Sequence, residues 1–399
     1  MRLGYTIVQT FKIMRKYLFT ALTCWGLMAN SGRCQTVDTL IDVGGYRLNF
    51  HIIKGKEMPI LFEAGAGADA TDWDIILKPI ADITHATLIT YARAGFGKSE
   101  LDTSNHDLDK HGILQGIQGL ETGLKKLGYN GKIMLVAHSY GGFCATLYAA
   151  RHPESVKAAV LIDANHVCWF QDAYVDSITT LRKKMYANMK NINWPDYYMA
   201  LNLPNTVQLM RKTPFPAAIP VIDLVADKVP PFPDSAGADR WRACHRQFAN
   251  AEPNRQGITA YGCAHFIFKD NPALAISAIV KAYTGTQGRE QGDAIMTRFL
   301  SWSLNAINEE KMMAVHLSEN DLNSRGYRLL GEGKIKEAVE VFKLNITFFP
   351  NSDNCYDSLA EAYEAAGDKA SAIANYKHSL ELNPKSPHSI ERLKVLQAQ

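Results

Sequence analysis

Six short apolar runs, separated by segments long enough for a helix, are the feature that most constrains the fold of this chain. Each run is rich in branched aliphatic residues and ends in turn-forming residues or at the start of a helix. The runs lie at residues 60–64, 87–91, 132–137, 158–163, 219–225 and 257–262. Buried parallel strands have this composition, and strands that alternate with helices form a sheet covered by helices. The sequence therefore predicts an α/β fold with a mainly parallel sheet.

A hairpin precedes these runs. Residues 40–43 and 46–53 are β-rich and flank Gly44-Gly45, a two-residue turn that accepts positive φ.

The length of 399 residues suits a unit of about 250 residues plus a smaller one. Because 43 Lys and Arg nearly balance 40 Asp and Glu, the net charge is only +3, which gives no support to a nucleic-acid partner.

The clearest chemical motif follows the third apolar run, where strand gives way to helix. It reads Ala137-His138-Ser139-Tyr140-Gly141-Gly142. The motif resembles the G-x-S-x-G nucleophile elbow of the α/β-hydrolase family, in which small residues around the serine permit a tight, strained turn. Ala137 replaces the first glycine and is still small. The resemblance implies an α/β-hydrolase sheet with Ser139 as the nucleophile, and the alternative is a chance turn of small residues.

A serine needs a base, and the base needs a carboxylate to orient it. The resemblance implies that these residues follow in the order serine, acid, histidine. Asp227 comes just past the run at 219–225, where catalytic acids of open sheets lie, and is our first choice. Asp163, which closes the run at 158–163, is the alternative acid. His265 follows the last run directly and is the predicted base, whereas His245 lies in a helical pattern more typical of a surface or packing residue.

Two backbone N–H groups should form an oxyanion hole. We expect one from Tyr140, next to the nucleophile, and the other from Ala66, in the glycine-rich loop after the first run. That loop also mimics a dinucleotide fingerprint, but no carboxylate for a ribose ends the next strand, so no cofactor is predicted. Residues 91–99 resemble the family's D-R-x-G-x-G-x-S turn, with Ala92 in place of Asp. Arg93 is interpreted as a clamp of this turn, and anion binding is the alternative.

An insertion at residues 166–218 is rich in Trp, Tyr, Phe and Met and is too apolar for a plain loop. We predict helices that cap the active site, with an extra packing layer as the alternative. The polar, turn-rich stretch at 284–288 marks the end of a hydrolase domain over 36–285.

The C-terminal part carries a repeat of 34 residues. Gly333, Ala338, Phe342 and Pro350 recur as Gly367, Ala372, Tyr376 and Pro384. This pattern resembles tetratricopeptide repeats, each a helix-turn-helix unit. We predict a helical linker over 286–318, then two repeats and a capping helix over 319–399. The repeats are candidates for binding a protein partner or for self-association, and a structural appendage is the plainer alternative.

The first 34 residues have the order of a secretory signal peptide. Arg15-Lys16 precede an apolar run at 17–29, and small or polar residues follow. The run is shorter than the roughly 20 residues of a membrane-spanning helix, so we expect cleavage and export to the periplasm or outside the cell. A lipid on Cys34 would instead hold the protein at a membrane, but Arg33 stands where such signals need a small residue.

The remaining cysteines, five in number from Cys144 to Cys355, allow one or two disulfides. They show no spacing typical of a metal site, so no metal is predicted, and Cys144 is expected to be buried.

The leading hypothesis is an exported serine hydrolase that cleaves an ester, or less readily an amide, of a small apolar substrate. An aminopeptidase on the same scaffold is the alternative enzyme, with Asp172, Asp176 and Asp196 as carboxylates that permit recognition of an amine. A non-catalytic binding protein that acts through its repeats is the alternative class.

Overall fold

The computed structural model describes residues 35–228, 235–308 and 318–398. The predicted signal peptide and Cys34 lie outside the described residues. The described residues contain an eight-stranded sheet in the order β1-β2-β4-β3-β5-β6-β7-β8. The strands are β1 (Thr36–Asp42), β2 (Arg47–Ile53), β3 (Glu57–Glu63), β4 (Ala86–Tyr91), β5 (Ile133–His138), β6 (Val156–Ile162), β7 (Val221–Ala226) and β8 (Arg255–Ala260).

All six predicted parallel strands and the hairpin are present. β2 pairs antiparallel with β4, whereas β4, β3, β5, β6, β7 and β8 run parallel to their neighbours. The hairpin turn places Gly44 and Gly45 at φ of 106° and 98°, a conformation that glycine adopts without steric cost. Parallel strands place their carboxyl ends at one edge, so the loops that follow β3, β5, β6 and β8 converge there.

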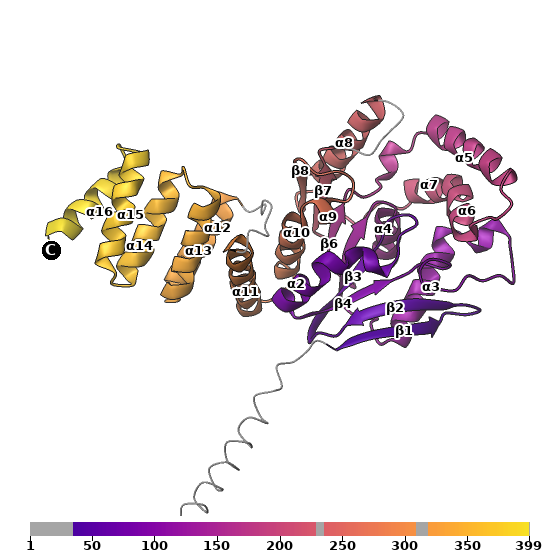
Figure 1. Ribbon diagram of the computed structural model, residues 1–399, viewed down its shortest axis with the longest axis horizontal. Coiled ribbons are helices and arrows are strands. Elements are labelled where there is room, and N and C mark those ends of the chain that lie inside the picture. The colour runs from indigo at the N-terminus through magenta and orange to yellow at the C-terminus, as the bar shows by residue number, and fades with distance from the viewer. Residues whose placement is uncertain (1–34, 229–234, 309–317, 399) are drawn as a thin grey trace, which may run out of the picture. The chain divides into compact units, whose positions relative to one another are not determined.

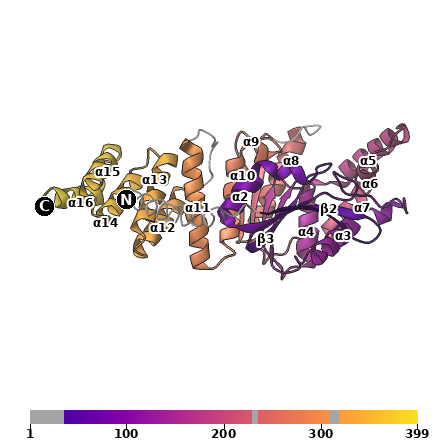
Figure 2. The same cartoon turned by 60° about the horizontal axis from the view of Figure 1, so that its bottom comes forward.

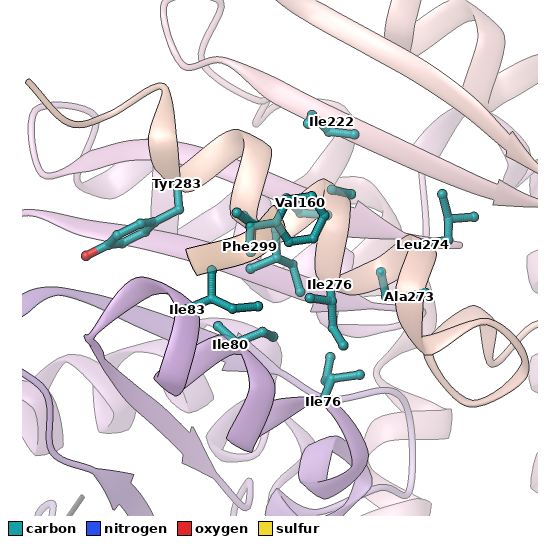
Figure 3. Packing of buried hydrophobic residues seen from close by; sticks show 14 of the residues in the cluster. Ile76, Ile80, Ile83, Val160, Ile222, Ala273, Leu274, Ile276, Tyr283 and Phe299 are labelled. Carbon is teal, nitrogen blue, oxygen red and sulfur yellow. The ribbon is translucent and has the colours of Figure 1, made fainter. Parts of the chain in front are cut away.

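Helices cover both faces of the sheet (Figures 1 and 2). Alternate residues of the central strands belong to two separate hydrophobic clusters, one on each face. On one face, Ile60 and Val160 pack against α2 (Asp74–Thr84), α10 (Pro272–Thr284) and α11 (Arg289–Asn308). Figure 3 shows Ile76, Tyr283 and Phe299 of these helices in this cluster. On the other face, Leu61 and Leu161 pack against α3 (Ile113–Lys126), α4 (Gly141–Arg151) and α8 (Ser235–Asn250).

The insertion between β6 and β7 is helical, as predicted. It contains η3 (Val167–Trp169), α5 (Asp172–Ala187), α6 (Trp194–Leu201) and α7 (Leu203–Arg211). A disulfide between Cys168 and Cys244 joins η3 to α8, and Cys144 is buried.

Helices continue through the C-terminal part: α12 (Glu319–Gly331), α13 (Ile335–Phe348), α14 (Asp353–Ala365), α15 (Lys369–Leu382) and α16 (Pro387–Ala398). α14 begins 34 residues after α12, at 353 against 319, and α15 begins 34 after α13, at 369 against 335. Gly326 of α12 lets the ring of Phe342 approach, because a Cβ there would lie 2.3 Å from that ring. None of the described helices is long and apolar enough to cross a membrane.

Candidate active site

Ser139 occupies a strained turn between β5 and α4. Its φ is 53°, in the left-handed region that residues with a Cβ seldom adopt. The turn passes so close to β3 that a Cβ at Gly141 would lie 2.3 Å from the carbonyl oxygen of Glu63. The carbonyl of Ser139 accepts the N–H groups of Gly142 at 2.9 Å and Asn165 at 2.8 Å, which fixes the backbone on both sides of the turn. The elbow predicted from the motif is therefore present as a backbone geometry.

His265 lies in the loop after β8 and contacts a buried carboxylate. Its Nδ1 is 2.6 Å from Oδ2 of Asp163, which directly follows β6 and is fully buried. Oδ1 of Asp163 accepts the backbone N–H of Ala226 at 2.9 Å and Nε1–H of Trp241 at 2.8 Å. Burial alone would raise the pKa of Asp163, but the hydrogen bond from His265 and the nearby His245 outweigh it and hold that pKa below its usual value. Asp163 is therefore held as an ionised acceptor for His265.

The expectation that Asp227 orients His265 does not agree with this geometry. Oδ2 of Asp227 instead accepts the backbone N–H of Gly262 at 3.2 Å, in the turn after β8. Both aspartates follow parallel strands at the same edge, so position along the sequence could not separate them. Asp163 reaches the imidazole because Ala226 and Trp241 fix its carboxylate, whereas the turn at Gly262 occupies that of Asp227. The alternative acid of the sequence analysis is the one the structure pairs with His265.

His138 joins the elbow to the loop that carries His265. Its Nε2 lies 2.9 Å from the carbonyl oxygen of His265, and the two rings are 4.6 Å apart between centroids. Burial, with a smaller contribution from His265, lowers the pKa of His138 to about 3, so its ring is neutral. A neutral ring that donates through Nε2 holds the backbone of His265 in place. His138 therefore contributes to the packing of the elbow against the loop that carries His265.

The loop after β3 lies against the elbow. A Cβ on Gly65 would be 2.9 Å from Nδ1 of His138 and 3.4 Å from Cβ of Ser139. Among the hydrogen bonds of the described residues, none uses the backbone N–H of Ala66 or of Tyr140. Both groups, predicted as the oxyanion hole, thus remain available at the turn that carries Ser139.

The guanidinium of Arg93 forms hydrogen bonds with the backbone of this loop. Its Nη1 donates to the carbonyl of Ala64 at 2.8 Å, and its Nη2 donates to the carbonyl of Gly65. The guanidinium also lies 3.8 Å from the buried carboxylate of Glu63, to which the hydroxyl of Tyr91 donates at 3.0 Å. Burial raises the pKa of Glu63 to about 7 in spite of Arg93 and Tyr91. Arg93 thus holds the loop of Ala66 rather than its own turn at 91–99, which the sequence predicts it to clamp.

A cavity of about 650 Å³ opens beside this loop and extends under the inserted helices. Ala66 and Tyr140 line one end. The rest of its lining is mainly apolar and comes from α5 to α7, including Ile178, Met185, Met189, Met199 and Leu203, with Arg182 and Asp196 as charged members. The insertion thus covers the space next to the elbow, which agrees with the prediction of a cap.

Two clusters in the described part of the chain bring three nitrogen or oxygen atoms of His and carboxylate side chains within 4.8 Å. One comprises Asp357, Glu361 and His388 near the C-terminus, where His388 pairs with both carboxylates at 2.8 and 3.1 Å. The other comprises His166, Asp223 and His245 and is held together by hydrogen bonds of 2.8 to 3.3 Å. In each cluster, hydrogen bonds or ion pairs link the histidine nitrogens to the carboxylates.

Comparison with known proteins agrees with this architecture. Residues 58–206 match the family described as alpha/beta hydrolase fold. The chain has an α/β-hydrolase fold. Among curated relatives, a proline iminopeptidase of Saccharolobus solfataricus is 24% identical over 42% of this chain and 55% of its own length. A (lyso)-N-acylphosphatidylethanolamine lipase of Bos taurus is 30% identical over 26% of this chain and 30% of its own length.

These relatives are matched over only part of their length, because this chain covers 55% of the iminopeptidase and 30% of the lipase. A solved structure of a thermophilic esterase from Thermogutta terrifontis covers 64% of this chain and 100% of its own, with 18% identity and a TM-score of 0.45.

Sequence reasoning missed three residues around Asp163. Trp241 donates to it, His245 approaches it, and Asp223 binds His245. The signal that was available is the spacing of Trp241 and His245, which places both on one face of a helix.

Proposed function

We propose that this protein is an exported serine hydrolase that cleaves an ester of a small apolar substrate through an acyl-enzyme. Ser139 is the nucleophile, His265 the base and then the acid, and Asp163 the carboxylate that fixes the imidazole. The observation that carries the proposal is the φ of 53° at Ser139. Such strain costs about 1 to 3 kcal/mol and persists where the turn serves a function.

The surrounding contacts support a role for each group. His265 donates to Asp163 through Nδ1, so its Nε2 is the nitrogen left to accept the proton of Ser139. The N–H groups of Ala66 and Tyr140 stabilise the negative charge that develops on the substrate oxygen. His265 returns the proton to the leaving group, and water then repeats the sequence on the acyl-enzyme.

The cavity under the inserted helices supports an apolar acyl or leaving group. Its lining by Met185, Met189 and Leu203 adapts to flexible apolar chains, because methionine is unbranched and polarizable. Arg182 and Asp196 add polar groups that would orient the substrate.

A fluorophosphonate probe tests the mechanism. We expect covalent labelling of the wild-type chain at pH 8 and none of Ser139→Ala. Ser104→Ala, at an exposed serine outside the elbow, is the matched control and should label like the wild type. If wild type does not label, the enzyme proposal fails and a non-catalytic binding protein is favoured, while labelling that survives Ser139→Ala moves the nucleophile elsewhere.

An aminopeptidase is the second candidate, and Asp196 is the observation that favours it. Its Oδ1 lies 3.9 Å from the Cβ position of Gly67, beside Ala66, and it lines the cavity. Asp172 is instead paired with Arg211 at 2.6 Å. Rates on esters of increasing chain length and on aminoacyl anilides separate the candidates. A preference for anilides that Asp196→Asn abolishes would favour the peptidase.

For the C-terminal helices we propose two tetratricopeptide repeats that serve self-association or a protein partner. The equal spacing of the two helix pairs and the contact of Gly326 with Phe342 support this proposal. Light scattering of the full chain gives its mass in solution. A mass above 44.3 kDa that falls on dilution would favour self-association, and a constant monomer mass would argue against it.

A further inference from the structure

A second buried cluster lies behind Asp163 and has no part in the proposed mechanism. It consists of His245 on α8, Asp223 on β7 and His166 just before η3. Nδ1 of His245 is 2.8 Å from Oδ2 of Asp223. Nε2 of His166 is 3.2 Å from Oδ1 of the same carboxylate. His245 is 2% exposed and Asp223 is 1% exposed, so neither charge is shielded by water.

His245 lies between two buried carboxylates. Its Nδ1 faces Asp223, while its Nε2 lies 3.9 Å from Oδ1 of Asp163 and has no hydrogen-bond partner among the residues that the structure describes. Since Nδ1 donates to Asp223, a neutral ring would turn the lone pair of Nε2 toward the negative charge of Asp163. A protonated ring instead presents an N–H to both carboxylates. The geometry therefore favours the imidazolium form at His245.

The other charged groups around the cluster leave this pairing in place. Burial lowers the pKa of His166, so that ring is neutral and donates to Asp223. The positive charge of Arg255 on β8 interacts electrostatically with the carboxylate of Asp223, and the carboxylate of Glu252 interacts in the same way with Arg255. His265 lies against the other oxygen of Asp163.

The titration directions agree with the geometry. Burial opposes the charged form of His245, but Asp223 and then Asp163 outweigh it and raise the pKa of His245. Burial opposes the charge of Asp223 as well, and its two histidines still bring its pKa down to about 2.

We infer that His245 is a positioning residue whose positive charge keeps Asp163 ionised and thereby sets the lower pH limit of catalysis. This inference rests on the proposed function of Ser139, His265 and Asp163. Helix α8 presents both Trp241 and His245 to Asp163, because residues four positions apart lie on one face of a helix. The disulfide at Cys244 ties the same helix to η3, next to His166.

The variant His245→Gln tests the charge while keeping an amide N–H for Asp223. The readout is the rate of ester hydrolysis and of fluorophosphonate labelling from pH 4 to 9. Without the cation at 3.9 Å, the coupled pair of Asp163 and His265 takes up a proton more readily. We expect the acid limb of kcat/KM to move up by about one pH unit, with the rate at pH 8 and KM within about threefold of wild type.

The control is His152→Gln, since His152 pairs with Glu121 at 2.8 Å outside the site. Its profile should match that of wild type. A His245→Gln profile that keeps its acid limb, with or without a lower plateau, overturns the inference, because a packing role changes the plateau alone. If wild type labels at no pH, the proposed function fails instead.

A second measurement does not require the variant to fold. In the wild-type chain with ¹⁵N-labelled histidine, both ring nitrogens of His245 should carry protons at pH 7.5. A neutral ring at that pH overturns the inference, whatever the fate of the variant.

Discussion

Nδ1 of His265 lies 2.6 Å from Oδ2 of Asp163, a residue that follows β6 and itself has a φ of 44°. Ser139, the proposed nucleophile, and Asp163 thus both occupy left-handed turns at the ends of neighbouring strands, Ser139 after β5 and Asp163 after β6. Strain at both turns is offset by buried hydrogen bonds around them. The contact between Nδ1 of His265 and Asp163 favours Asp163 over Asp227 as the aspartate that orients the imidazole.

Asp163→Asn should lower kcat by about 10³ to 10⁴, because an amide can hold the imidazole in the wrong tautomer. Asp227→Asn should change kcat by less than about threefold, since within the described residues its carboxylate accepts a hydrogen bond from the backbone of Gly262 and none from His265. Steady-state ester hydrolysis at pH 8 measures both. A larger loss in Asp227→Asn than in Asp163→Asn would restore Asp227 as the acid.

Gly141→Ala should disrupt the elbow, because its Cβ would lie 2.3 Å from the carbonyl oxygen of Glu63. We expect a loss of about 2 kcal/mol or more in the free energy of unfolding, or loss of fluorophosphonate labelling in a folded chain. Gly116→Ala is the control. Gly116 lies inside α3, and a Cβ added there would meet no atom within 4 Å apart from the backbone of its own helix. This substitution should leave the free energy of unfolding unchanged or raise it by up to about 1 kcal/mol.

Arg93→Lys should lower kcat by about tenfold to a hundredfold and leave KM nearly unchanged. A lysine cannot reach both the Ala64 and Gly65 carbonyls with one planar group, so the loop of Ala66 loses its clamp. Lys98→Ala, at an exposed residue of the same turn, should keep wild-type kinetics. Equal rates in Arg93→Lys and wild type would remove the clamp from the mechanism.

Glu63→Gln should stabilise the protein at high pH. The pKa of Glu63 is raised to about 7 by burial, so the folded state binds a proton that the unfolded state releases above about 4.5. Wild-type stability therefore falls from pH 4.5 to 7, by at most about 3 kcal/mol for this group. Thermal melts should show a gain in Tm for Glu63→Gln that is small at pH 4.5 and larger at pH 8. A gain independent of pH would contradict the titration.

Gly326→Ala should destabilise the C-terminal helices without changing ester hydrolysis, because its Cβ would lie 2.3 Å from the ring of Phe342. Hydrogen exchange in α12 and α13 measures the effect. Gly331→Ala is the control, because a Cβ added at this end of α12 would meet no atom within 4 Å. Its amide hydrogens should exchange at the wild-type rate. Activity lost in step with exchange would show that the two parts of the chain are coupled.

The sequence alone determined the elements and the order of the chemical groups. Buried parallel strands carry continuous apolar runs, so all six were found, and the need for small residues around a strained turn identified Ser139. His265 followed from its place directly after the last strand. These features are local, because a few consecutive residues specify them.

The tertiary structure decided which groups meet. Asp163 and Asp227 are equivalent by position, and only the buried donors Ala226 and Trp241 select Asp163. His245 looked like a packing residue within its helix, and it gained a role only when the fold placed it between Asp223 and Asp163. These contacts join residues 22 to 82 positions apart and depend on how strands and helices pack, so no local pattern records them.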